Sequence, residues 1–110
     1  MGVKLELNDP NISRDFIYVD DVASAIKKLT SNSTAQGVFN IGSGVPTNIT
    51  LMVSKVYRYF GLEFKVLKTD QIRSLTADTS RIKEVCGWDP AYTISIGIDE
   101  YIKWADKAGL

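Results

Sequence analysis

The chain has 110 residues, of which 45% are hydrophobic and 24% charged, and its 13 basic and 13 acidic residues leave no net charge. This composition indicates one globular domain, without a basic stripe for nucleic acid or an acidic disordered tail. The apolar runs are too short to cross a membrane and the first residues do not resemble a signal peptide, so we expect a cytoplasmic protein. Because histidine is absent and Cys86 is the only cysteine, a Ser-His-Asp or Cys-His site, an internal disulfide and a thiolate metal cage are also excluded within this chain.

Hydrophobic periodicity and turn signals predict that strands alternate with helices, which defines the α/β class. The expected strands are short and cover residues 3–7, 16–19, 38–41 and 64–67. The four expected helices cover residues 21–30, 50–60, 79–86 and 94–107. No repeat or linker interrupts this order, so residues 1–110 are expected to form a single domain.

Residues of capping type mark the ends of the expected helices. Asp20 or Asp21 is expected to cap the first helix, and Thr50 the second, because their side-chain oxygens can accept N–H groups left free in the first turn. Gly61 and Gly87 follow the second and third helices, where a left-handed residue ends a helix. The paired aspartates are therefore interpreted as structural rather than as an acid/base pair.

A Gly-Ser-Gly sequence at 42–44 follows a predicted strand, as phosphate-binding loops do. It lacks the third glycine of a dinucleotide loop, because Thr47 stands there, and it lacks the Gly-Lys pair of a Walker loop. A strand-ending turn that needs glycine conformations is the preferred interpretation, with a backbone approach to a ligand as the alternative. No tyrosine has a lysine four residues later, so the sequence predicts no catalytic residue and no cofactor loop.

Cations beside strands and turns are the remaining candidates for ligand binding: Arg14, Lys68, Arg73 and Arg81. Arg14 stands between a polar loop and an expected strand. Composition leaves two alternatives for it, a solvated surface charge or a clamp for an anion.

Three stretches together resemble one protein family. They are SRDFIYVDDVASAI at 13–26, FNIGSGVPTNITLMVSKV at 39–56 and LTADTSRIKEVCGWDPAYTISIGIDEYIKW at 75–104. They resemble, in the same order, the R-D-F-I-Y-V-D-D-V-A segment, the N-I-G-S-G strand with its helix, and the D-x-S-R/K, L-G-W-x-P and final-helix motifs of the extended short-chain dehydrogenase/reductases. These are the NAD-dependent nucleotide-sugar epimerases and dehydratases, and the resemblance implies the C-terminal lobe of a Rossmann-type enzyme.

The resemblance implies a nucleotide-sugar-binding fragment of an NAD(P)-dependent epimerase, dehydratase or reductase. In the family, NAD or NADP is bound by an N-terminal Rossmann domain, and a Tyr-x-x-x-Lys pair moves the proton. Neither motif is in this chain, so we expect it to be inactive and to bind no cofactor alone.

The implied partners are a nucleotide-diphosphate-sugar, the enzyme's own Rossmann domain and, in a homodimer, a second copy. The D-D-V-A helix and the N-I-G strand would pack toward the Rossmann domain, so an isolated piece would expose apolar surface. The alternative is a stand-alone module that binds a nucleotide or nucleotide-sugar without turnover. A Gly-rich loop and a Tyr-x-x-x-Lys pair upstream would favour the enzyme part.

The family pattern also implies site residues. Arg14 matches the arginine that binds the substrate diphosphate, for which its planar guanidinium is suited, and Asp15 could orient it. Lys68 occupies the position of a second cation ten residues before the D-x-S motif, but lysine lacks the guanidinium fork. Arg73 is the competing candidate.

The remaining implied contacts are weaker. Asp70 and Gln71 match positions near the ribose or sugar hydroxyls, and Leu7 and Asn8 match the stretch that borders the base. A solvated surface position is the alternative for each. Trp88 in the G-W-x-P motif is interpreted as a structural aromatic plug.

Overall fold

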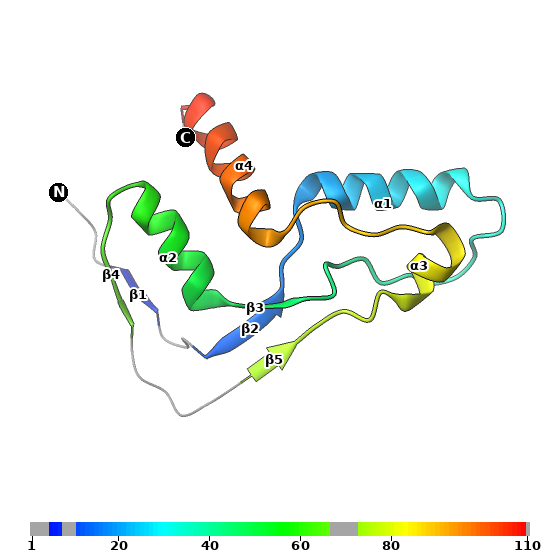
Figure 1. The fold of residues 1–110 in the computed structure, drawn as a ribbon, viewed down its shortest axis with the longest axis horizontal. Coiled ribbons are helices and arrows are strands. Elements are labelled where there is room, and N and C mark those ends of the chain that lie inside the picture. The colour runs from blue at the N-terminus through cyan, green and yellow to red at the C-terminus, as the bar shows by residue number, and fades with distance from the viewer. Residues whose placement is uncertain (1–4, 8–10, 67–72, 110) are drawn as a thin grey trace.

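The computed structural model describes residues 5–7, 11–66 and 73–109. The elements follow in the order β1 Leu5–Leu7, β2 Ile12–Asp15, α1 Val19–Ser31, β3 Pro46–Asn48, α2 Ile49–Tyr59, β4 Phe64–Val66, β5 Arg73–Leu75, α3 Ser80–Cys86 and α4 Ile94–Lys107 (Figure 1). This arrangement confirms the predicted α/β class and the four predicted helices.

The described strands form two small sheets. In the larger sheet β2 is central, with β3 antiparallel on one side and β5 parallel on the other. In the smaller sheet β1 pairs parallel with β4. Both parallel pairs join segments that are far apart in the chain (Figure 1). Residues distant in the sequence therefore lie on adjacent strands.

Two of the predicted strands are wrong. Residues 16–18 are unpaired coil and Val19 already begins α1, while the neighbouring strand is β2, at residues 12–15. Residues 38–41 form no strand, and Val38 is 80% exposed. Both segments have strand-forming composition, but no described strand lies beside them to complete a hydrogen-bonded ladder.

The starts of α1 and α2 differ from the prediction, whereas the start of α4 and two helix ends agree with it. The N-cap of α1 is Tyr18, without a side-chain cap, and both aspartates lie inside the first turn. The N-cap of α2 is Asn48, whose side chain accepts from Thr50 N–H at 2.8 Å. Thr50, the expected cap, is therefore the residue whose N–H is capped. Gly61 and Gly87 have φ near +65°, as expected for residues that end helices.

The main hydrophobic core lies between α1 and α3. Ala25, Ile82 and Trp88 are buried there, and Trp88 is only 2% exposed. Its Nε1–H donates to Ser24 Oγ at 2.9 Å, so the one polar atom of the ring has a partner. These contacts confirm the interpretation of Trp88 as a structural plug.

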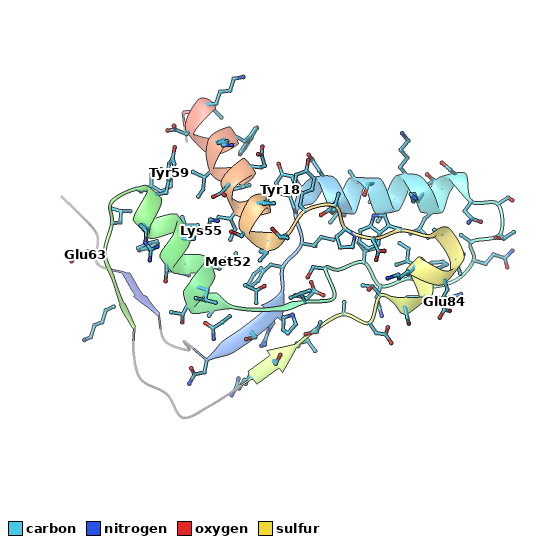
Figure 2. The ribbon with its side chains drawn as sticks, viewed as in Figure 1. Tyr18, Met52, Lys55, Tyr59, Glu63 and Glu84 are labelled. Atoms are coloured by element: carbon cyan, nitrogen blue, oxygen red, sulfur yellow. The ribbon has the colours of Figure 1, made fainter. Side chains whose placement is uncertain are left out.

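A second contact joins α2 to α4 mainly through polar groups. Lys55 Nζ donates to the Ser95 carbonyl at 3.0 Å and lies 3.2 Å from Asp99 Oδ1. One turn later on α2, Tyr59 donates to Asp106 Oδ2 at 3.3 Å. Lys55 and Tyr59 both lie on α2, and these bonds tie it to α4 (Figure 2).

The molecule is flat and extended for its size. Its dimensions are 54 × 38 × 17 Å and its radius of gyration is 16.7 Å, whereas about 13 Å is typical of a compact chain of this length. Its accessible surface is 7931 Å², about 1,900 Å² more than the roughly 6,000 Å² expected for a folded monomer of this mass. The chain therefore leaves much of its apolar surface uncovered.

Candidate functional site

The three-stranded sheet brings Arg14 and Arg73 onto adjacent strands. In the β2–β5 register, Ile12 pairs with Arg73 and Arg14 pairs with Leu75. Paired residues project from the same face of a sheet, and so do residues two apart in one strand. Arg14 and Arg73 therefore project from the same face, which is the juxtaposition that a two-cation anion clamp requires.

Arg14 is half-buried, and its position is defined by both neighbouring strands. Its Nη1–H donates to the Ser13 carbonyl at 2.9 Å. Across β2–β3 it is paired with Thr47, whose side chain projects from the same face. Among the described residues, no ion pair joins Arg14 to a carboxylate. Its positive charge is therefore not neutralised by a described acid.

Asp15 does not orient the Arg14 guanidinium, contrary to expectation. Adjacent residues of a strand project to opposite faces, and the Asp15 carboxylate binds elsewhere. Oδ1 accepts from the N–H and the hydroxyl of Ser43, at 2.7 and 2.5 Å, and Oδ2 accepts from Gly44 N–H at 2.9 Å and Ala77 N–H at 3.1 Å. The N–H groups of the Gly-Ser-Gly turn thus donate to the Asp15 carboxylate of the same chain.

The surroundings of Asp15 favour its charged form. Burial alone would raise the pKa of this carboxyl, but the hydrogen bonds from Ser43, Gly44 and Ala77 outweigh that effect and lower it. Gly42 leaves room for this carboxylate, because a Cβ there would lie 2.7 Å from Asp15 Oδ2 and 2.8 Å from the Ala77 Cβ. The alternative that this turn approaches an external ligand is therefore disfavoured, since Ser43 and Gly44 already donate to Asp15.

Asp21 has a similar structural role on α1. Its side chain is 1% exposed, and its two oxygens accept from Ala91 N–H at 2.8 Å and Tyr92 N–H at 3.1 Å. It therefore joins the start of α1 to the turn before α4. This finding supports the structural interpretation of the aspartate pair, although the partner is a distant segment rather than the helix's own first turn.

Arg81 is committed to the fold. Its guanidinium donates to the Gln36 carbonyl at 2.6 Å and to the Val38 carbonyl, and it lies 4.4 Å from the centre of the Phe39 ring. A planar cation can satisfy carbonyls and stack on an aromatic face at once. Of the four candidate cations, Arg81 thus serves to hold the 36–39 loop.

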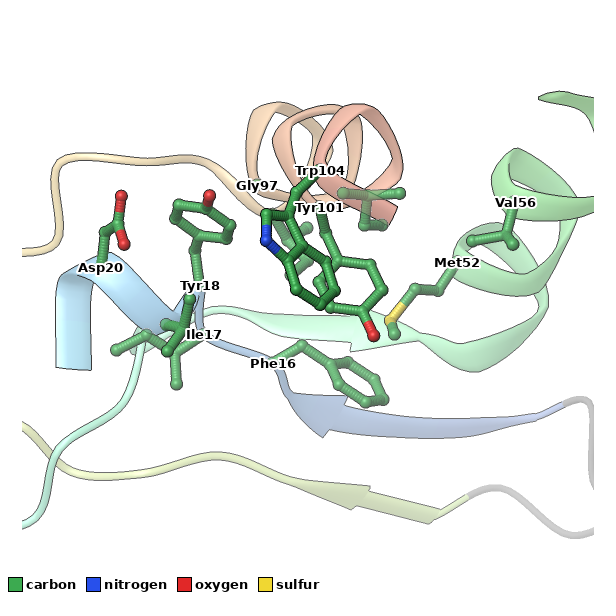
Figure 3. Close-up of a pocket in the computed structure, with 12 residues that line it drawn as sticks. Phe16, Ile17, Tyr18, Asp20, Met52, Val56, Gly97, Tyr101 and Trp104 are labelled. Carbon is green, nitrogen blue, oxygen red and sulfur yellow. The ribbon is translucent and has the colours of Figure 1, made fainter. Parts of the chain in front are cut away.

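An apolar pocket of about 660 Å³ lies beside the larger sheet, between α2 and α4 (Figure 3). Its lining is mostly aliphatic and aromatic, and it comprises Phe16, Ile17, Tyr18, Val19, Asp20, Met52, Val56, Ile94, Gly97, Ile98, Tyr101 and Trp104. Arg14 is not part of this lining, so the pocket and the two-arginine face are separate features. No local sequence pattern indicates this pocket, because its walls come from three distant segments.

Tyr18 is the most constrained ring of this pocket. Its ring centre lies 4.7 Å from that of Tyr92, and its Cβ lies 3.0 Å from where a Cβ on Gly97 would be. Burial, followed by the charges of Asp20 and Glu100, raises the pKa of its hydroxyl. The hydroxyl therefore stays protonated at neutral pH.

Several predicted site residues cannot be placed. Asn8, Lys68, Asp70 and Gln71 lie outside the described residues. Leu7 is the last residue of β1 and pairs with Val66, and its side chain is not described. Within the described ranges, no group of three or more acidic or cysteine side chains gathers as a metal site would require, and no helix is both long and apolar enough to span a membrane.

The sequence matches curated enzymes over one part of their length, although no family model matches it. It is 34% identical to the dTDP-L-rhamnose 4-epimerase of Burkholderia thailandensis over 87% of the chain and 28% of that enzyme. It is 29% identical to the GDP-6-deoxy-D-mannose reductase of Pseudomonas aeruginosa over 83% of the chain and 32% of that enzyme. The chain is a relative of the nucleotide-sugar epimerases and reductases. It spans about a third of their length.

Solved structures agree with this relationship. RMD from Pseudomonas aeruginosa, solved with NADPH, has 29% identity and a TM-score of 0.73 over 90% of the chain and 34% of that protein. The dTDP-glucose 4,6-dehydratase of Bacillus anthracis, solved with NAD, has 25% identity and a TM-score of 0.77 over 94% of the chain and 35% of that protein. The fold matches the C-terminal regions of these Rossmann-type enzymes, as the sequence motifs predicted.

Proposed function

We propose that this chain is the nucleotide-diphosphate-sugar-binding part of an NAD(P)-dependent epimerase, dehydratase or reductase. The observation that carries the proposal is the placement of Arg14 and Arg73 on one face of adjacent strands. The names of the relatives support the substrate class, since the two curated enzymes above are named for dTDP- and GDP-linked sugars.

The chemistry of this face suits a diphosphate. Neighbouring strands lie about 4.8 Å apart, so two cations on adjacent strands repel each other unless an anion lies between them. Arg14 has no described acidic partner, and its planar fork can hold two phosphate oxygens at once. Thr47 on the same face offers a hydroxyl to the same ligand.

In this proposal the reaction itself belongs to a part outside these residues. The chain has no Tyr-x-x-x-Lys pair and no dinucleotide loop, so it would be inactive alone. NAD or NADP would be bound by a Rossmann domain, as the NAD and NADPH complexes of structural relatives suggest. The role of residues 1–110 would be to hold the substrate so that its sugar faces the nicotinamide.

We further propose that this Rossmann domain covers the apolar face of the chain. Val19 and Val38 are 64% and 80% exposed, and Trp104 at the pocket is 56% exposed. Val19 and Val38 come shortly before the D-D-V-A and N-I-G segments, whose own Val22 and Ile41 are half-buried. The excess surface of about 1,900 Å² is on the scale of a domain or subunit interface.

The anion site is tested with the 110-residue chain and two probes, UDP and pyrophosphate. Titration followed by NMR should shift the amide signals of β2 and β5 before those of other elements. Arg14→Ala should weaken binding by about 1.5–3 kcal/mol, the contribution of a hydrogen bond to a charged group, and Arg14→Lys should restore part of it. Binding should also weaken with added salt.

Arg58→Ala is the matched control, because Arg58 is an exposed arginine at the end of α2, away from β5. It should leave the affinity for both probes unchanged. If Arg14→Ala binds UDP as tightly as the unmodified chain, Arg14 is a solvated surface charge and the proposed substrate clamp is wrong.

A further inference from the structure

The structure points to a positioning role for Asp15, which no comparison assigns. We propose that the Asp15 carboxylate is a built-in anion that fixes the β2–β5 pair and leaves the charge of Arg14 available for a ligand. The part of this inference that concerns the ligand rests on the proposed function. The part that concerns the strand pair stands on the hydrogen bonds alone.

The first argument is where the bonds of Asp15 lie. Asp15 is the last residue of β2, and Ala77 lies two residues beyond the end of β5. The last paired residues of the ladder are Arg14 and Leu75. The bond from Ala77 N–H to Asp15 Oδ2 therefore continues the pairing of the two strands by means of a side chain, at the point where the backbone ladder stops.

The second argument is that only a carboxylate fits this place. Oδ1 receives two donors from Ser43, and Oδ2 receives the N–H groups of Gly44 and Ala77. An asparagine has the same shape, but its NH₂ group would face two N–H donors or two Ser43 donors, and the groups left without an acceptor would be partly buried. Gly42 lies directly against this carboxylate, because a Cβ at that position would be 2.7 Å from Asp15 Oδ2.

The third argument concerns charge. An aspartate next to an arginine usually neutralises part of its field, but here the two side chains leave β2 on opposite faces. Backbone N–H groups and one hydroxyl satisfy the acid without a cation. Asp15 thus leaves the charge of Arg14 available on the opposite face while it holds the two strands in register.

The test uses the 110-residue chain with Asp15→Asn and Asp15→Ala. Hydrogen exchange of the β5 amides should become at least about tenfold faster in both variants, because each leaves the part-buried N–H donors of Ser43 or Ala77 without an acceptor. Pyrophosphate affinity should fall at least about fivefold. Asp21→Asn is the matched control, since Asp21 also accepts two backbone N–H groups from a distant segment but does not contact β5. Asp21→Asn should change neither the exchange rate of the β5 amides nor the pyrophosphate affinity by more than about twofold.

Addition of formate tests whether Asp15 acts as a built-in anion or only contributes to overall stability. In Asp15→Ala the space of the lost carboxylate should accept formate, which should restore slow exchange in β5, whereas chloride at equal ionic strength and formate with Asp15→Asn should not. If Asp15→Ala does not fold without formate, far-UV circular dichroism should show folding on its addition, and a chain that stays unfolded contradicts the proposal.

The outcomes for the two proposals are distinguishable. Unchanged β5 exchange in Asp15→Ala, or an equal change in Asp21→Asn, would show that Asp15 does not position the strand pair. If the unmodified chain binds no pyrophosphate, the proposed function fails, and the exchange and formate measurements still decide the role of Asp15.

Discussion

At the scale of single residues, polar side chains join segments that are far apart in the sequence. Asp15 and Asp21 each bind N–H groups of a distant turn, and Ser24 accepts the indole N–H of Trp88. Such groups stabilise a fold only while both partners are present, because a buried donor or acceptor without a partner is costly. Substitutions at these residues should therefore lower the free energy of unfolding by more than the volume of the removed atoms suggests.

The two tryptophans provide a matched test. Trp88→Phe should lower the free energy of unfolding by about 1–3 kcal/mol, because it removes the bond to Ser24 and leaves a small cavity. Trp104→Phe should change it by less than about 0.5 kcal/mol, because Trp104 is 56% exposed. Urea denaturation followed by far-UV circular dichroism measures both. Equal losses in the two variants would contradict the assignment of the core to Trp88.

At the scale of elements, the sequence predicts the helices better than the strands. A helix is encoded locally, so apolar spacing and glycine stops placed α2, α3 and α4 within a few residues. A strand exists only beside another strand, and this cannot be read from one segment. The segment at 16–19 has strand composition without a partner, whereas β5 is the polar tripeptide Arg73–Leu75 and is a strand because it lies beside β2.

The same reasoning explains which site residues could be predicted. Arg14 was identified by its match to a family position and Arg73 as the competing candidate for the second cation, and their strand register then showed that they share a face. The bonds of Asp15 link residues 15, 43, 44 and 77, and no local pattern in the sequence indicates that these meet. A neighbouring arginine suggested the wrong partner for the acid, because strand alternation separates adjacent side chains.

The start of α2 gives a prediction at this scale. Asn48→Ala should lower the free energy of unfolding by about 1 kcal/mol, because Thr50 N–H loses its acceptor, and Asn48→Asp should retain most of it. Asn40→Ala is the control, since Asn40 lies in a loop and makes only a long 3.4 Å bond to the Asp78 carbonyl. Thermal unfolding of the three variants is the measurement. A larger effect at Asn40 than at Asn48 would argue against this cap.

At the scale of the whole molecule, the chain is a thin plate with two modest packing centres. Its buried hydrophobic residues are Ala25, Ile82, Trp88, Ile98 and Ile102 among those described. Hydrophobic stabilisation grows with the area removed from water, so a plate only 17 Å thick gains less of it than a compact domain does. Much of the missing burial corresponds to the apolar face at the pocket.

This exposed face should bind the apolar dye ANS. Trp104→Ser should lower the dye fluorescence by about half or more, because an aromatic ring supplies a large share of the apolar contact area of the pocket. Leu51→Ser is the control, because Leu51 is 69% exposed on α2 and does not line the pocket. Fluorescence titration at matched protein concentration measures the effect. An equal decrease in both variants would mean that the dye does not report on this pocket.

The pairing of β2 with β5 has a consequence for the order in which the protein is made. The two strands are separated by about sixty residues, so at roughly 5–20 residues per second Arg14 leaves the ribosome several seconds before Arg73 does. During that interval β2 can pair with β3, which follows it closely, but its other edge has no neighbour. An unpaired strand edge attracts other chains, so the interval before β5 arrives is when the nascent protein is most exposed to aggregation.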